Sequence, residues 1–325
     1  MQRIVTYAAR NNDVTLVTWG PAEKEYQEDA VNVITVRAAG KDYLFSRRRA
    51  ISRKGREIAN QFDVVHSLFS DCTFHLPRNG FIMTLHVLPG VVHYKELRQN
   101  LFLLLKYQVL QKRAFRRAKE IACVSRNLLE ALPGKYKAKA RFIPHGVDTE
   151  FWDPALAKTP AAIPEGPYVL CVGAHGLDRQ LLADFVGANP VINFVFVGIK
   201  DKLGDYANTY YMHKVSDEDL RDLYFGASLM FRPLLFATAN NSILEALAMG
   251  KTVLASRIPG VTDYLTDDTC IFIDSLKDKS LSGLLPGPLT SSSLRQAALN
   301  NFSWDKVLAT YSQLYQQQSN NSDHG

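Results

Sequence analysis

The chain has 325 residues, 46% of them hydrophobic, and a formal net charge of +6. This length exceeds what one core usually supports, so we expect two domains of roughly 150 residues each. No stretch approaches the roughly 20 uncharged apolar residues of a membrane-spanning helix, and the first residues are too polar for a signal peptide. We therefore expect a cytoplasmic protein. The four cysteines lack metal-ligand or redox spacing, which favours buried thiols.

Positive charge is concentrated in the first half. Residues 1–150 hold 25 Lys and Arg against 14 Asp and Glu, or +11, whereas residues 151–325 hold 13 against 18, or −5. The asymmetry indicates either an anionic partner, a membrane surface or nucleic acid, or merely solvated helix faces. The densest clusters are Arg47, Arg48, Arg49, Arg53, Lys54 and Arg56, then Lys112, Arg113, Arg116, Arg117 and Lys119.

The first half alternates predicted strands and helices. Residues 1–10 look like the end of a helix, so the first strand and the turn that normally open a doubly wound domain are apparently missing. Helical periodicity predicts helices at about 45–60 and 94–119. Pro, Gly and Asp in 144–154 end the first domain. Strands of a sheet covered on both faces are predicted at 14–20, 62–68, 81–87 and 121–125.

The second half repeats the alternation, and a last amphipathic stretch begins near 302. The pattern predicts an α/β protein with two Rossmann-like, doubly wound domains, 1–155 and 156–300, facing a central cleft. Residues 318–325 are too polar to fold, which predicts a disordered tail. Strands are predicted at 168–173, 192–198, 228–234, 252–256 and 270–274, with helices in the gaps, notably 217–227 and 240–250.

The strongest local pattern is a strand, a polar turn and a helix that begins near Asn241. Asn240, Asn241 and Ser242 are natural cap residues, and the backbone N–H groups behind them form an anion site suited to a diphosphate. Glu245 falls about one turn into the helix, where its carboxylate could accept two hydrogen bonds from a ribose diol. The alternative is an ordinary cap followed by a surface acid.

This pattern resembles family 4 of the retaining glycosyltransferases with the GT-B fold. The usual motif is a Glu, seven residues, and a second Glu in a helix followed by Ala-Met-Ala-Cys-Gly. Glu245 and the following ALAMGKTVLAS match its second half. The first Glu falls at Ala237, and Thr238 to Asn241 replace the glycine-rich turn. A subgroup carries a similar Thr-Ala-Asn-Asn sequence, so the departure indicates specialisation, with loss of activity as the alternative.

Other segments resemble the same family in the same order, from about residue 14 to 317. TLHVLPG at 84–90 implies that His86 lies beside the transferred sugar, although a lone His after a strand is more often structural. Ser125 resembles a helix cap. His145 takes the Asn position of a Pro-Asn-Gly-Val-Asp interdomain segment. Residues 301–317 resemble the closing helix that returns to the N-terminal, acceptor-binding domain.

The resemblance also implies that cationic side chains directly after the strand at 168–173 bind the donor. After Gly173, which we expect at the donor, the family usually has an Arg and then a Lys directed at the diphosphate. Here Ala174 replaces the first, and Arg179 stands near the second. Arg179 is the candidate for stabilising the leaving group. The alternative is an ordinary helix-start pair of Asp178 and Arg179.

The resemblance implies a retaining, metal-independent hexosyltransferase. It would move sugar from a UDP-, GDP- or similar nucleotide-sugar to a hydroxyl of a glycan or lipid-linked acceptor, without a cofactor, in cell-surface polysaccharide or glycolipid synthesis. The basic domain would dock on anionic lipid, peripherally, at the inner face of the membrane. The alternatives are a non-catalytic glycosyltransferase-like subunit and a sugar-nucleotide epimerase or hydrolase. No nucleic-acid motif is present, so we expect no nucleic-acid partner.

Overall fold

The computed structural model describes residues 2–37, 43–78, 80–88, 101–160, 163, 165–276, 278–285, 289 and 291–319. The contacts divide the chain into two compact units. Unit 1 comprises Met1–Pro144 and Val307–Gly325, and unit 2 comprises His145–Lys306. The break lies at the start of the Pro- and Gly-containing segment 144–154. Outside the described residues lie 89–90 of the motif at 84–90, residues 94–100 of the predicted helix and residues 320–325 of the predicted tail.

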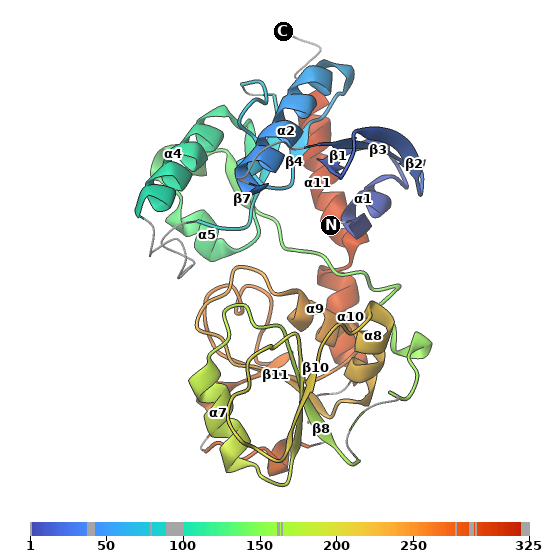
Figure 1. Cartoon of the computed structure of the whole chain (residues 1–325), viewed down its shortest axis with the longest axis vertical. Helices are drawn as coiled ribbons and strands as arrows, with labels where there is room; N and C mark the ends of the chain where they lie inside the picture. The colour runs from blue at the N-terminus through green and yellow to red at the C-terminus, as the bar shows by residue number, and fades with distance from the viewer. Residues whose placement is uncertain are drawn as a thin grey trace. The chain divides into compact units, whose positions relative to one another are not determined.

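Unit 1 contains two sheets (Figure 1). One has the order β1-β3-β2 and the other β4-β5-β6-β7. Its described strands are β1 (Val14–Trp19), β2 (Lys24–Glu28), β3 (Val31–Val36), β4 (His66–Ser67), β5 (Ile82–Leu85), β6 (Glu120–Cys123) and β7 (Ala140–Phe142). Its described α-helices are α1 (Gln2–Ala8), α2 (Tyr43–Ile58), α4 (Leu101–Arg117), α5 (Arg126–Ala131) and α6 (Gly134–Lys137).

The division of unit 1 into two sheets corrects the prediction of a single sheet. β2 pairs antiparallel with β3, and all five of its residues are exposed, so it lacks the apolar run by which a buried strand is recognised. The strand predicted at 62–68 shrinks to the two residues of β4, which lies between 3₁₀ helices at Ala59–Gln61 and Ser70–Cys72. The segments β3 and β7 were not predicted.

Unit 2 contains one six-stranded sheet in the order β10-β9-β8-β11-β12-β13, with every neighbouring pair parallel. The order reverses between β8 and β11, which makes their carboxyl ends the switch point of the sheet. The strands are β8 (Tyr168–Val172), β9 (Asn193–Val197), β10 (Thr209–Met212), β11 (Leu229–Arg232), β12 (Val253–Ala255) and β13 (Cys270–Phe272). Only β10 was not predicted.

Both faces of this sheet are covered by apolar cores. In β8, Leu170 belongs to one buried cluster with residues of α8 (Asp217–Gly226), α9 (Asn241–Ala248) and α10 (Ser291–Asn301). Its neighbour Cys171 belongs to the other cluster, with residues of α7 (Arg179–Ala188). The alternation of side chains along a strand therefore feeds two cores, as the apolar runs of the sequence predict.

Helix α11 (Trp304–Ser319) begins in unit 2 and from Val307 belongs to unit 1. Within unit 1, Tyr315 bonds Nδ1 of His66 at 2.8 Å, and Tyr311 bonds the hydroxyl of Thr84 at 3.1 Å. Thr84 in turn bonds Nε2 of His66 at 2.8 Å. This buried network ties the last helix to β4 and β5. Among the described residues, no helix is long and apolar enough to cross a membrane.

Candidate functional site

The candidate site lies in unit 2, at the carboxyl ends of β8 and β11. Gly173 follows β8 directly and has a φ of +81°, a conformation that residues with a Cβ rarely adopt. Its N–H donates to the carbonyl of Val197 at 2.8 Å. The chain can therefore leave the sheet sharply at the switch point, where open α/β sheets usually bind ligands.

Arg232, the last residue of β11, donates hydrogen bonds to the loop that follows β8. It is only 3% exposed and donates to the carbonyls of Gly173, at 2.6 Å, and His175, at 2.8 Å. Its Nε is buried with no hydrogen-bond partner among the described residues. Desolvation lowers the pKa of the guanidinium to about 10. Sequence reasoning missed Arg232, although a charge at the end of an apolar strand is a usable signal.

Two glycines hold the turn between β11 and α9. The N–H of Leu235 donates to the carbonyl of Gly176 at 2.8 Å, and a Cβ at Gly176 would lie 2.4 Å from the carbonyl oxygen of Phe236. A Cβ at Gly260 would lie 2.2 Å from the carbonyl oxygen of Ala237. Both glycines have positive φ. Ala237, which stands where a first motif Glu was expected, is thus buried under a closely packed backbone.

The N-terminus of α9 is left open. Asn240 occupies the cap position, but its Oδ1 accepts the hydroxyl of Ser242 at 2.6 Å, and the Asn240 side chain makes no cap hydrogen bond to the helix N–H groups. The predicted cap by the Asn240 side chain is therefore absent, although the backbone carbonyl of Asn240 accepts the N–H of Leu244 at 3.4 Å. Ser242 is buried and Asn241 is exposed. The first N–H groups of a helix carry partial positive charge, so this open end can receive an anion.

Glu245 lies in the second turn of α9, and Tyr224 of α8 positions it. The hydroxyl of Tyr224 donates to Glu245 Oε2 at 3.0 Å and lies 3.1 Å from the carbonyl of Ser242. Tyr224 is fully buried, and desolvation, followed by the charge of Glu245, raises its pKa well above the usual value. Trp152 packs edge-on against its ring at 5.6 Å. Sequence spacing carries no signal for Tyr224.

Arg179 is the first residue of α7, directly after the cap Asp178, whose side chain accepts the N–H of Leu181 at 3.0 Å. The Nη2 of Arg179 donates to the carbonyls of Asp201 and Lys202, at 3.1 and 3.0 Å. Arg179 is exposed. These contacts favour the helix-start interpretation, because this guanidinium nitrogen holds the loop after β9.

His86 belongs to unit 1, where it follows β5, and its ring packs against Phe69 at 5.4 Å. The six other predicted site residues belong to unit 2. Ser125 caps α5 by accepting the N–H of Leu128 at 3.2 Å, which confirms that prediction. The backbone of His145 donates to the hydroxyl of Tyr264 at 2.8 Å, within unit 2.

Metal-binding patterns are not assembled in the part of the chain that the structure describes. No group of three or more His, Cys, Asp or Glu is placed to hold an ion there. The triplet Asp217–Glu218–Asp219 has the Asp-x-Asp spacing, but it forms the first turn of α8, where Ser216 accepts the N–H of Asp219 at 3.0 Å. Cys123, Cys171 and Cys270 are free and buried.

Two family models match the chain, the first mainly in unit 1 and the second within unit 2. The model described as Glycosyltransferase Family 4 matches residues 4–151, and the model described as Glycosyl transferases group 1 matches residues 168–281. The chain belongs to the glycosyltransferase family that these two models describe, family 4 of the GT-B glycosyltransferases. Lipopolysaccharide glucosyltransferase WaaG of Escherichia coli K12 is 28% identical over 143 residues, which are 40% of this chain and 38% of that relative.

Solved structures share the GT-B fold of that family. A sucrose-phosphate synthase from Thermosynechococcus elongatus matches with a TM-score of 0.72 and 16% identity, over 97% of this chain and 91% of its own. Anabaena Alr3699/HepE in complex with UDP and glucose matches with a TM-score of 0.66 and 12% identity, over 96% and 94%. A WaaG structure matches with a TM-score of 0.58 and 17% identity, over 99% and 89%.

Proposed function

We propose that the chain is a nucleotide-sugar glycosyltransferase that moves a hexose-type sugar to an acceptor hydroxyl with retention at the anomeric carbon. The observation that carries the proposal is the pairing of Glu245 with an open helix N-terminus at the switch point of the unit 2 sheet. A carboxylate accepts hydrogen bonds from a ribose diol, and helix N–H groups donate hydrogen bonds to a diphosphate. Family membership and a structural neighbour that holds UDP and glucose support this assignment.

In the proposed reaction the bond between the anomeric carbon and the diphosphate oxygen breaks as the acceptor oxygen bonds to that carbon. The acceptor proton passes to the leaving diphosphate on the same face, so no side-chain base is required. The N-terminus of α9 would stabilise the developing negative charge. Glu245 would hold the nucleoside, and Gly173 would let the loop after β8 approach it closely. The reaction needs neither a metal nor a cofactor.

Two residues have secondary roles in the proposal. His86 would contact the sugar, which fits its position at the carboxyl end of a buried parallel strand. Arg179 would stabilise the leaving group with the part of its guanidinium that does not bond Asp201 and Lys202. Of the two, Arg179 has less support, because its Nη2 is already committed to the loop after β9.

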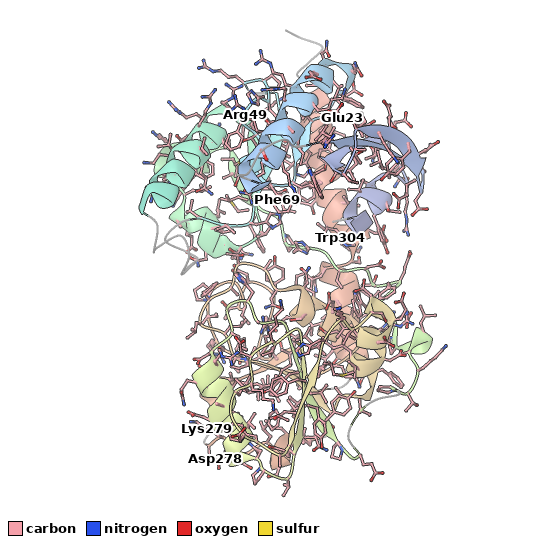
Figure 2. All side chains as sticks on the ribbon, in the orientation of Figure 1. Glu23, Arg49, Phe69, Asp278, Lys279 and Trp304 are labelled. Carbon is pink, nitrogen blue, oxygen red and sulfur yellow. The ribbon has the colours of Figure 1, made fainter. Side chains whose placement is uncertain are left out.

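The acceptor is proposed to be a glycan or lipid-linked molecule at an anionic membrane surface, as in cell-surface polysaccharide or glycolipid synthesis. Arginines of α2 and α4 gather on unit 1 around His75, whose pKa is lowered by desolvation and then by four of them. In Figure 2, Arg49 is labelled between α2 and α4. Arg78, Arg113, Arg116 and Arg117 line a cavity of about 570 Å³. Such clusters attract anionic lipid by about 1 kcal/mol per residue.

Donor binding tests the centre of the proposal. Thermal shift and saturation-transfer measurements with UDP-, GDP- and ADP-sugars should identify a ligand, and Glu245→Ala should weaken it at least about 30-fold, because two charge-assisted hydrogen bonds are lost. Glu218→Ala, which removes an exposed carboxylate from α8, is the matched control. Unchanged binding in Glu245→Ala, with an unchanged melting temperature of the free protein, would remove the proposed site.

Turnover separates the transferase from its rivals. A transferase releases the nucleoside diphosphate in proportion to an added acceptor, whereas a hydrolase or epimerase acts without one. Binding without turnover across an acceptor panel would instead favour a non-catalytic subunit. The specific observation behind that alternative is the buried Ala237, which brings no carboxylate to the turn.

Membrane docking is tested by co-sedimentation at low salt. Vesicles rich in phosphatidylglycerol should bind the protein, and phosphatidylcholine vesicles should not. Arg113→Ala combined with Arg116→Ala should weaken binding about 30-fold, whereas Lys135→Ala with Lys137→Ala, on α6 of the same unit, serves as the charge-matched control. Equal losses in both double variants would indicate attraction by net charge alone.

A further inference from the structure

The arginine cavity of unit 1 has a volume of about 570 Å³ and is lined by Arg78, Arg113, Arg116 and Arg117. Arg78 comes before β5 and Arg117 before β6, so both belong to the amino ends of two parallel strands. His86 directly follows β5, at the carboxyl ends. The cavity therefore lies at the opposite edge of this sheet from the position proposed for the transferred sugar, and the proposed reaction does not use it.

Two helices direct arginines toward this region. Residues three and four positions apart adjoin on a helix, so each helix carries its arginines on one face. The residues are Arg49, Arg53 and Arg56 on α2, and Arg113, Arg116 and Arg117 on α4. Desolvation and then arginines of both helices lower the pKa of His75, which indicates that the two faces meet around that residue.

The lining arginines differ in how firmly they are held. Arg117 is half-buried and donates to the carbonyl of Leu76, which fixes its guanidinium. The other three lining arginines are exposed, and among the described residues none of the four forms an ion pair with a carboxylate. Desolvation and then the charges of Arg113, Arg78 and Arg56 lower the pKa of Arg117. An anion in the cavity would thus relieve repulsion between like charges.

The arrangement of the donors selects the chemistry of the anion. A guanidinium binds phosphate through two parallel hydrogen bonds, and the cavity offers four such groups. A phosphomonoester carries a charge of about −1.5 to −2 at pH 7 and three free oxygens. A phosphodiester carries about −1 and has only two free oxygens. The phosphomonoester can therefore engage more of the arginines and neutralise more of their charge.

An exposed apolar side chain beside the cavity favours a membrane as the source of this phosphate. Val109 stands four residues before Arg113 on α4, so the two side chains lie on one face of the helix. Val109 is 63% exposed. Helices that lie in a membrane interface combine such apolar side chains with arginines at the level of the headgroups. A phosphate free in solution would gain nothing from Val109.

We propose that the arginine cavity binds one phosphomonoester on the headgroup of a membrane lipid, and that Val109 enters the interface beside it. The inference deepens the proposed membrane docking and rests on that part of the proposed function. Docking by net charge alone attracts every anionic lipid in proportion to its charge. The cavity adds selectivity for the doubly charged phosphate, because only there do several guanidinium groups converge on one group of oxygens.

The test compares two kinds of vesicle. Phosphatidylcholine vesicles contain either phosphatidic acid, which is a phosphomonoester, or phosphatidylglycerol, which is a phosphodiester, in amounts that give the same zeta potential. Co-sedimentation is measured at physiological salt, where attraction between distant charges is screened more than direct ion pairs. We expect about tenfold tighter binding to the phosphatidic acid vesicles, with slower amide exchange at residues 113–117.

A variant that conserves charge isolates the role of the guanidinium groups. Arg113→Lys combined with Arg116→Lys keeps the net charge on exposed positions but loses both forks, so binding to phosphatidic acid should fall about tenfold while binding to phosphatidylglycerol stays unchanged. Lys135→Arg with Lys137→Arg, on α6, is the matched control and should keep the preference. Val109→Asn should weaken binding to both vesicles by the same factor.

The outcomes separate this site from the docking proposal. Equal affinity for the two vesicles would overturn the phosphomonoester site and leave docking by net charge standing. Glycerol 3-phosphate is the soluble counterpart, and if it bound as tightly and released the protein from vesicles, the membrane source would be wrong. A preference that survives in the Arg113→Lys, Arg116→Lys variant would place the site elsewhere. Absence of binding to either vesicle at low salt would overturn both proposals, whereas donor binding in unit 2 is tested independently.

Discussion

The two units differ in how many sheets they contain and in where their charged side chains lie. Unit 2 is one sheet with a core on each face, and its polar groups meet at the switch point, where Arg232 and two glycines fix the loops. Unit 1 is divided into two sheets, and arginines of α2 and α4 gather around His75. The proposed donor site thus lies where the polar groups of unit 2 meet, whereas the proposed membrane-docking surface of unit 1 consists of the arginines on its helices.

The largest expected effect tests how firmly the turn of unit 2 is held. Gly260→Ala combines positive φ with a Cβ that would lie 2.2 Å from the carbonyl oxygen of Ala237, so it should lower the free energy of unfolding by about 3 kcal/mol or more. Gly166→Ala carries strain alone, since nothing lies within 4 Å of its Cβ, and should cost about 1 kcal/mol.

The control for this pair is Gly283→Ala, which has neither a close neighbour nor positive φ. Chemical denaturation, monitored by amide exchange in unit 2, measures the free energy of unfolding of all three variants. Equal effects at Gly260 and Gly166 would show that the turn relaxes freely and is not a fixed part of the site.

The next effect concerns the buried guanidinium. Arg232→Met should lower the free energy of unfolding by about 2–4 kcal/mol, because the carbonyls of Gly173 and His175 lose their donors, and it should weaken donor binding. Arg179→Met removes an exposed guanidinium from the same unit and should cost less than about 1 kcal/mol. A stable Arg232→Met variant with full donor affinity would contradict a role in shaping the loop.

Unit 1 has its own pH signature. Desolvation and, second, His86 lower the pKa of His66 from 6.5 to about 3. Between these values the unfolded chain binds the extra proton, so stability is full above pH 6.5 and falls as the pH drops, by up to about 1.4 kcal/mol per unit. From pH 7 to pH 5 the loss should be about 2 kcal/mol.

Amide exchange in β4 and β5 measures this loss, and His66→Gln should remove most of the pH dependence while it keeps partners for Thr84 and Tyr315. The same change in unit 2 amides would contradict its assignment to unit 1. An unaltered pH dependence in His66→Gln would assign it to another group.

The smallest effect tests the support of Glu245. Tyr224→Phe keeps the buried ring against Trp152 but loses the hydroxyl that donates to Glu245 Oε2. Donor affinity should fall about fivefold, in line with one hydrogen bond of about 1 kcal/mol. Tyr210→Phe, an exposed tyrosine of β10, is the control. A loss in both variants would indicate a general effect of tyrosine removal.

Most of unit 2 could be predicted, because its strands are unbroken apolar runs and its helices carry caps such as Asp178 and Ser216. The start of α9 near Asn241 and the position of Glu245 within it also followed from local pattern. Unit 1 was harder. β2 is wholly exposed and β4 has two residues, so neither produces the periodicity from which strands are inferred.

The sequence by itself determined the α/β class, the family motif around Glu245 and the excess of positive charge in the first half. Only the tertiary structure decided that Tyr224, 21 positions away, holds that carboxylate, and that Arg232 fastens a loop 59 residues earlier. It also decided that residues of β1 and β4 line one cavity. Local periodicity reports neighbours along the chain, whereas these contacts depend on which strands become adjacent, and loop closure over long separations leaves no local trace.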